Sequence, residues 1–545
     1  MTGPRMACLL LVNGRCHTQD PACPRATAVA IRAGRILAVG GDADIRALGG
    51  PGAQTLDLEG RRVIPGLVDG HIHYYDWALG RRRLQLAGMA SLGQVTGRVA
   101  QAAQATPAGG WILGLGWLET DWADGRMPLR ADLDRAAPGH PVLLWRADLH
   151  LAAANSLALR LAGIGPGTPD PPMGVIDRDG EGRPTGILRD LAINLVTGRI
   201  PPPTDAQVAQ AFTAGFQALH RLGLTGIHDQ RLMGGIEGGA ALRAWQTLAA
   251  DGSLDLRVWT NLPGERLDEA IALGLCTGLG NDRLRIGHCK FFADGAQGVR
   301  TAWQLEPYAG GGGTGLPLTP METLENALRR AREHGLALSV HANGDRANRE
   351  LARVFQRVLD APPAPGAVPP RAPHRIEHMQ LIRPEDIQRF ARLGVMGSVQ
   401  PVEVAEDMAM MEATVGERSR YGHAWRSIWD AGIRLAFGSD APVSDPDPFL
   451  GIHAAVTRQR RDGTPPEGWH PEQRLTVAEA VWAYTMGPAL ATGQERDQGS
   501  ISPGKRADLV VLDRDLFHLD PMELASVRPV LTVFDGRVVC AGAGN

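Results

Sequence analysis

The chain has 545 residues, 44% of them hydrophobic and 21% charged, so it can bury a large core and form more than one domain. Its 56 basic and 59 acidic residues give a net charge of −3, and no stretch mixes clustered Lys and Arg with aromatic residues as a nucleic-acid surface does. The six cysteines lack CxxC spacing, which argues against a disulfide scaffold or a structural zinc site. No run of about 18 apolar residues occurs, and the apolar run near the N-terminus is too short for a signal peptide. We expect a cytoplasmic protein with a small-molecule substrate and no nucleic-acid or membrane partner.

Both ends of the chain carry the pattern of a small β-domain. Residues 8–60 read as short strands separated by glycine turns. The last stretch, from residue 499 onward, has the same pattern of short strands and glycine turns. We therefore expect a β-sandwich domain built from both termini, with residues 1–62 as its first part and residues 491–545 as its second.

Between these ends lie eight strand candidates, which alternate from the second onward with helical patterns. They cover residues 63–73, 224–230, 254–262, 284–295, 336–345, 374–380, 395–401 and 433–442. Repeated βα units indicate a parallel sheet. The predicted fold class is α/β with a TIM-like (β/α)8 barrel, whose first strand lies in residues 63–79 and whose remainder lies in residues 211–490.

The connection after the first strand is too long for an ordinary loop. We expect residues 80–210 to form an inserted subdomain with strands at 111–117 and 141–150 and a helix at 155–163. Because this segment leaves the loop after strand one, where parallel barrels carry their active sites, it is the predicted substrate lid.

Two histidines end the first strand candidate. His71 and His73 are one residue apart, so on an extended strand their side chains point the same way and can bind one ion together. An HxH pair alone is weak evidence for a metal site. This pair stands at a strand end, and further ligand types follow at the ends of later strands.

Lys290 lies in the fourth strand candidate. An ammonium group offers no lone pair to a metal, so a lysine in this set implies chemistry on its nitrogen. Addition of carbon dioxide would give a carbamate, an anion able to bridge two divalent ions. The alternative is a surface or barrel-interior lysine paired with Asp294.

His341 and His378 end the fifth and sixth candidates and would hold a second ion through neutral imidazole nitrogens, although each could equally be an interior histidine. Asp440 follows the eighth. Its carboxylate suits a group that touches one ion, takes the proton of the nucleophilic water and passes it to the leaving amine. The alternative is the N-cap of the next helix, a place that Ser439 or Ser444 could also take.

Several of these motifs together resemble the amidohydrolase superfamily, in particular amidohydrolase family 3, which includes N-substituted formamide deformylases. The resemblance covers nearly the whole chain. Its matching stretches include PGLVDGHIH, KFFADGAQGVRTAW, HANGDRANRE, RIEHMQ, GSDAPV and PGKRADLVVLD. It implies a metal-dependent hydrolase with two zinc ions per chain and a carbamate on Lys290. The implied metal ligands are His71, His73, Lys290, His341, His378 and Asp440, with Asp440 also catalytic.

The insert departs from the commoner family pattern, with RADLH where a glycine often precedes the histidine and with Asp190 where a glutamate is usual. The specificity of a named member is therefore not carried over. Asp148, His150 and Asn155 resemble the insert's signature, and both a structural role and a substrate contact stay open for them.

Aromatic residues are the part of the sequence from which we predict the shape of the substrate. The predicted substrate contacts are Trp77, Trp117, Trp122, His150 and Trp303. Indoles suit the wall of an apolar cleft, and the alternative is that they are core residues.

The predicted reaction is hydrolysis of an amide C–N bond, in a small hydrophobic or aromatic N-acyl or N-formyl substrate, by a hydroxide that bridges two metal ions. The alternatives are a cyclic amidase or a deaminase of the same superfamily, esterase or lactonase activity at the same site, and a scaffold protein without activity. A homodimer or a higher homo-oligomer is compatible with the resemblance.

Overall fold

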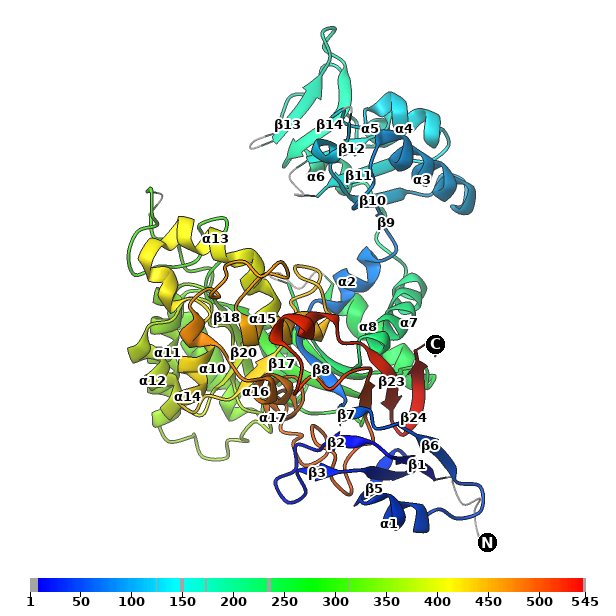
Figure 1. Cartoon of the computed structure of the whole chain (residues 1–545). Coiled ribbons are helices and arrows are strands. Elements are labelled where there is room, and N and C mark those ends of the chain that lie inside the picture. The colour runs from blue at the N-terminus through cyan, green and yellow to red at the C-terminus, as the bar shows by residue number, and fades with distance from the viewer. Residues whose placement is uncertain are drawn as a thin grey trace. The chain divides into compact units, whose positions relative to one another are not determined.

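The computed structural model describes residues 8–123, 125–147, 151–171, 174–232, 237–311 and 313–542. The chain divides into two compact units (Figure 1). The first joins Met1–Trp77 to Phe212–Asn545, and the second is Ala78–Ala211. The second unit nearly coincides with the predicted insert.

A near-closed parallel sheet of eight strands forms the centre of the first unit, and all eight strand candidates correspond to its strands. In sheet order from the first barrel strand these are β8 (Leu67–Ile72), β15 (Leu224–Asp229), β16 (Arg257–Pro263), β17 (Leu284–Phe292), β18 (Leu338–Ala342), β19 (Arg375–His378), β20 (Met396–Val399) and β21 (Leu435–Phe437). Each strand pairs with the next along the chain, as repeated right-handed βα units require. The predicted α/β fold with a barrel sheet is confirmed.

Amphipathic helices follow the barrel strands in the sequence. In α11, Leu351, Phe355 and Val358 recur at helical spacing and are buried. Two helices, α2 (Tyr74–Gly80) and α7 (Asp205–Arg221), cross the boundary between the units. The helices within the first unit are α1 (Asp42–Ala47), α8 (Gly238–Ala250), α9 (Leu267–Ala272), α10 (Met321–Glu333), α11 (Asp345–Asp360), α12 (Pro384–Arg392), α13 (Val404–Val415), α14 (Trp425–Asp430), α15 (Pro448–Thr457), α16 (Val477–Ala483) and α17 (Met486–Ala491). Among the described residues, no helix is both long and apolar enough to cross a bilayer.

Hydrogen bonds join the first barrel strand to the segment after the last. The backbone N–H groups of Ser439 and Asp440 donate to the carbonyl of His71, at 3.2 and 2.7 Å. The Ser439 hydroxyl donates to Asp69 Oδ2 at 2.6 Å. A Cβ on Gly438 would lie only 2.4 Å from the His71 nitrogen, so the closure needs a glycine there. The barrel therefore closes at the residues predicted to bind metal.

Two further sheets share an apolar core that includes Leu11, Val63 and Val511. One sheet comes from the N-terminal segment alone, in the order β5 (Arg35–Gly40), β4 (Ala28–Arg32), β1 (Leu9–Val12) and β6 (Gln54–Asp57). The other combines both chain ends, in the order β24 (Arg537–Ala541), β23 (Pro529–Phe534), β22 (Leu509–Leu512), β7 (Arg62–Pro65), β2 (Arg15–His17) and β3 (Arg25–Ala26). Strand β7 pairs with β22 and leads directly into β8, so the C-terminal residues support the start of the barrel.

The second unit has its own six-stranded sheet with an apolar core on each face. Its strands, in sheet order, are β13 (Gly174–Arg178), β14 (Pro184–Asp190), β12 (Leu151–Ala154), β11 (Val142–Arg146), β10 (Ile112–Trp117) and β9 (Leu84–Gln85). Its helices are α3 (Leu92–Ala105), α4 (Arg130–Ala136), α5 (Ser156–Leu161) and α6 (Ile193–Thr197). The predicted role of this unit as a substrate lid stays a prediction.

Candidate metal centre

The predicted ligands come from the carboxyl ends of five barrel strands. His71 lies in β8 and His73 directly after it, Lys290 lies in β17, and His341 lies in β18. His378 is the last residue of β19, and Asp440 follows β21 after two residues. Because carboxyl ends of parallel strands meet at one end of a barrel, residues far apart in sequence converge there.

The converging side chains approach one another closely. Asp440 Oδ1 lies 3.3 Å from His71 Nε2 and 3.2 Å from His73 Nε2. The ring centroids of His71 and His378 are 5.0 Å apart, and those of His341 and His378 are 4.5 Å apart. One ligand atom each from His71, His378 and Asp440 lies within 4.8 Å of the others, and all three residues are buried.

Three buried atoms of this cluster make no well-formed hydrogen bond among the described residues, although Asp440 Oδ1 lies within 3.3 Å of two imidazole nitrogens. They are His71 Nε2, His73 Nδ1 and Asp440 Oδ1. A buried polar atom left unpaired costs roughly 1–3 kcal/mol, so native structures rarely gather several in one place. Imidazole nitrogens and a carboxylate are typical ligands of zinc and related divalent cations. The donor set therefore fits a metal ion.

Lys290 is only 2% exposed. Burial lowers the pKa of its amine to about 8, against the opposing effect of the nearby Glu377 and Asp440 carboxylates. A neutral amine is the form that can react with carbon dioxide. The alternative pairing of Lys290 with Asp294 is not present among the described residues, because the Asp294 carboxylate accepts backbone N–H groups of Asn343, Gly344 and Trp303 at 2.7–3.0 Å instead.

Asp440 is not a helix cap. The N-cap of α15 is Asp447, whose carboxylate accepts the N–H of Phe449 at 2.9 Å, and Ser439 bonds to Asp69. The backbone of Asp440 has a φ of 58°, and that of His378 has a φ of 70°. Such left-handed conformations cost free energy for a residue with a side chain and concentrate at functional sites.

Glu377, which sequence reasoning missed, orients His71. Its Oε2 lies 2.6 Å from His71 Nδ1, and its Oε1 accepts from Ser339 Oγ and Arg375 Nε, each at 2.5 Å. Burial alone would raise the pKa of Glu377, but Arg375, His71 and Lys290 hold it well below its ordinary range. The ionised carboxylate therefore accepts the Nδ1 proton and leaves the Nε2 lone pair of His71 for a metal. The sequence carried a partial signal, because the charged residues Arg375 and Glu377 lie inside a short barrel-strand candidate, but it did not show their partners.

A second polar group beside Asp440 was also missed. Glu403, 9% exposed, ends the short turn Pro401–Glu403 after β20. Burial and the nearby carboxylates of Asp440 and Asp407 raise the pKa of Glu403 well above its ordinary range. Asp407 Oδ2 accepts from Gln380 Nε2 at 2.6 Å and lies 2.9 Å from His423 Nε2.

The described residues among the predicted substrate contacts belong to both units. Trp117 and Trp122 lie in the core of the second unit and donate to the carbonyls of Leu144 and Met89, at 3.0 and 2.8 Å, so packing accounts for both. Trp77 is buried in α2 beside Tyr74, with ring centroids 5.4 Å apart.

Trp303 is half-buried, and Arg346 lies 4.8 Å from the centroid of its indole ring. Asn155 caps α5 and has its own structural role in the second unit. His150 and Asp148 lie outside the described residues.

Comparison with known proteins agrees with this geometry. A model of the amidohydrolase family matches residues 54–540. YtcJ of Bacillus subtilis (strain 168) is 34% identical over 497 residues, which cover 90% of this chain and 91% of YtcJ. N-substituted formamide deformylase of Arthrobacter pascens is 28% identical over 553 residues, 98% of each chain. The crystal structure of an uncharacterized metal-dependent hydrolase from Pyrococcus furiosus has a TM-score of 0.77 and 27% identity, and the match covers 94% of this chain and 100% of that one. The chain belongs to the amidohydrolase family and is a metal-dependent hydrolase that acts on carbon–nitrogen bonds.

Proposed function

We propose that this enzyme hydrolyses the amide bond of a small N-acyl or N-formyl compound with a hydrophobic or aromatic amine part, using two zinc ions. The observation that carries the proposal is the cluster of unpaired buried atoms on His71, His73 and Asp440. The formamide deformylase among the relatives supports an amide substrate.

The residues divide into two ligand groups in this proposal. His71, His73 and Asp440 would hold one ion, and His341 and His378 would hold the other. A carboxylated Lys290 would serve both, which accounts for a lysine buried among imidazoles. Bound divalent cations would polarise the substrate carbonyl and lower the pKa of a water molecule toward neutrality.

Asp440 would handle the proton. Burial alone would raise the pKa of its carboxyl group, but His71 and His73 hold it well below its ordinary range, so it is ionised and able to accept. It would take the proton of the attacking water as the water oxygen bonds to the carbonyl carbon. It would then give that proton to the nitrogen as the C–N bond breaks, releasing an amine and a carboxylic acid.

Amine release from a matched substrate panel tests this proposal. The zinc-loaded protein would be given the N-formyl, N-acetyl and N-acylamino-acid forms of one aromatic amine. We expect turnover of at least one form, which is lost in Lys290→Ala. Lys505→Ala is the matched control, because Lys505 Nζ bonds to the carbonyls of Glu495 and Gln498 at 2.5 and 3.2 Å rather than to the metal cluster.

Silence across the panel with metal bound would reject the proposed substrate class and direct the search to cyclic amides, esters and lactones. Turnover that persists in Lys290→Ala would reject the role of the lysine. The predicted self-association and the lid role of residues 80–210 stay predictions.

A further inference from the structure

A layer of polar side chains lies in the barrel behind the metal residues. Arg375, Glu377, Ser339 and His228 come from β19, β18 and β15, and none is more than 2% exposed. A charge buried this deeply is stable only when it is paired and hydrogen-bonded, so the partners of this layer define its role.

The guanidinium of Arg375 has three partners. Its Nε donates to Glu377 Oε1 at 2.5 Å, and its Nη2 donates to the carbonyl of Gly70 at 3.0 Å. Its Nη1 lies 2.8 Å from His228 Nδ1. Glu377 is the partner of the His71 ring, and Gly70 is the residue before His71. Arg375 therefore holds His71 at two points, through its side-chain partner and through its backbone.

In the hydrogen bond between Arg375 and His228, only one assignment of donor and acceptor is possible. Arginine can only donate, so His228 Nδ1 must carry a lone pair and accept. His228 is then neutral, with its proton on Nε2. Burial, reinforced by Arg375, holds the pKa of His228 well below its ordinary range, in agreement with this form. An acceptor at this position fixes the plane of the guanidinium fork.

We propose that Arg375 is a positioning residue of the metal centre, which acts on His71 through Glu377 and the Gly70 carbonyl, and that His228 orients its guanidinium. The inference rests on the metal-dependent function and is independent of the proposed substrate. A carboxylate that accepts the Nδ1 proton fixes the imidazole tautomer and makes Nε2 a stronger ligand. Arg375 holds that carboxylate in place through its hydrogen bond to Oε1.

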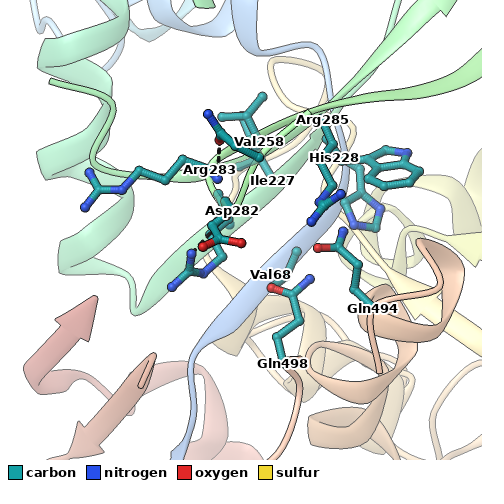
Figure 2. A pocket seen from close by; sticks show the side chains of 13 residues that line it. Val68, Ile227, His228, Val258, Asp282, Arg283, Arg285, Gln494 and Gln498 are labelled. Carbon is teal, nitrogen blue, oxygen red and sulfur yellow. Dashed lines mark hydrogen bonds between the residues drawn. The ribbon is translucent and has the colours of Figure 1, made fainter. Parts of the chain in front are cut away.

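The chain of contacts ends at a cavity distinct from the metal cluster. His228 lines this cavity together with Arg285, Gln494 and Gln498 (Figure 2). The cavity has about 20 Å³ of space for the centre of a water-sized molecule, which is room for about one water. Contacts from His71 through Glu377 and Arg375 to His228 thus connect the metal centre to a small polar cavity beside the starts of β16 and β17.

If Arg375 only stabilised the fold, its replacement would affect stability and not metal binding. Breaking a buried ion pair destabilises a protein whether or not the pair touches a ligand site. In that case the folded variants would bind metal like the parent protein. Zinc affinity of the folded protein therefore separates the two roles, and it needs no substrate.

The test compares Arg375→Lys with Arg257→Lys. Lysine keeps the positive charge and loses the planar fork. Arg257 is the matched control, because it is a buried arginine at the start of a barrel strand whose bonds go to Asp508, Asp535 and the Asp282 carbonyl. Zinc dissociation constants would be measured by competition with a chromophoric chelator, on protein shown by circular dichroism to be folded. We expect about 10–100-fold weaker zinc binding in Arg375→Lys and a change of less than about twofold in Arg257→Lys.

The visible spectrum of the cobalt-loaded protein gives an independent readout, since its bands respond to ligand geometry. We expect altered bands in Arg375→Lys and in Glu377→Gln, with little further change when the two are combined. Unchanged zinc affinity and an unchanged cobalt spectrum in folded Arg375→Lys would overturn the proposal.

A second pair of variants covers the case in which Arg375→Lys does not fold. His228→Gln keeps an acceptor oxygen and His228→Leu does not. We expect weakened zinc binding in His228→Leu and at least partial rescue in His228→Gln. Equal, parent-like affinities in both variants would overturn the role of His228. Failure of the amide panel would leave these outcomes unaffected, so the two proposals fail separately.

Discussion

The buried charged groups compared at the two ends of the barrel differ in whether they have hydrogen-bond partners. At the amino end, Arg257 donates to both oxygens of Asp508, at 2.5 and 2.9 Å, and also reaches Asp535 at 3.3 Å. At the carboxyl end, polar atoms of His71, His73 and Asp440 are buried without hydrogen-bond partners among the described residues. Arg257 is thus fully paired within the protein, whereas these three carboxyl-end atoms have no such partner and fit a bound metal ion.

Backbone conformation sharpens this contrast. Two of the predicted ligands, His378 and Asp440, have φ values of 70° and 58°. The surrounding hydrogen bonds, such as the 2.7 Å bond from the Asp440 N–H to the His71 carbonyl, keep these residues in place. The strained backbone thus lies at the end of the barrel that carries the predicted metal ligands.

Metal removal should have the largest effect. Protein treated with a chelator should lose amide hydrolysis down to background, because nothing else completes the carboxyl-end cluster, and zinc should restore it. Zinc at 1,000 times its dissociation constant should add about 4 kcal/mol to the free energy of unfolding, which a thermal melt would detect. Full activity in protein shown by elemental analysis to lack metal would contradict this.

Asp440→Asn should reduce kcat by about 10²–10⁴, the usual contribution of a proton-transferring side chain. The amide keeps the size of the carboxylate and loses its ability to take a proton. Asp447→Asn is the matched control, since asparagine serves equally well as the N-cap of α15. Steady-state kinetics with metal analysis would check both, and a kcat within threefold of the parent in Asp440→Asn would rule out the proposed role.

Asp508→Ala should destabilise the fold without changing zinc binding at the metal centre. Without Asp508, the buried Arg257 keeps only the weaker partner Asp535. We expect this loss to lower the free energy of unfolding by about 3 kcal/mol. Asp497→Ala removes the partner of a half-buried arginine near the surface, Arg35, and should cost about 1 kcal/mol or less. Denaturant melts would measure both. Equal losses, or weakened zinc binding in Asp508→Ala, would break the comparison between the barrel ends.

Asn155→Ala should have the smallest effect, confined to the second unit. Asn155 Oδ1 accepts the N–H groups of Ala158 and Val142, each at 3.0 Å, and its Nδ2 donates to the His140 carbonyl at 2.8 Å. We expect a loss of about 1–2 kcal/mol, seen as faster amide exchange in α5 and β11. Asn155→Asp keeps the acceptor and should lose less. A large fall in zinc affinity would show instead that Asn155 affects the metal centre.

The barrel strands and the convergence of the predicted ligands could be predicted, because both follow from local sequence pattern. Buried parallel strands are short apolar runs, and a polar residue where such a run ends, like His341 or Asp440, stands out. Since parallel strands point the same way, their ends converge without further information about the fold.

Glu377 and Arg375 were not predictable in this way. Their partners, His71, Gly70 and His228, lie in β8 and β15, which are not neighbours of β19 in the sheet. Which side chains meet across a barrel depends on how its strands are staggered, and sequence spacing does not reveal that. Trp117 and Trp122 show the converse, because the same large apolar side chain suits a core and a cleft equally well.

The pairing of β7 with β22 has a consequence for synthesis. Residues 62–65 leave the ribosome long before their antiparallel partner, residues 509–512. Domains generally fold from the N-terminus as they are made, yet β7 cannot pair with β22 until residues 509–512 have been made. Strand β8, which carries His71 and is followed by His73, comes directly after β7, so the sheet that supports the first two predicted metal ligands waits for a segment made more than 400 residues later.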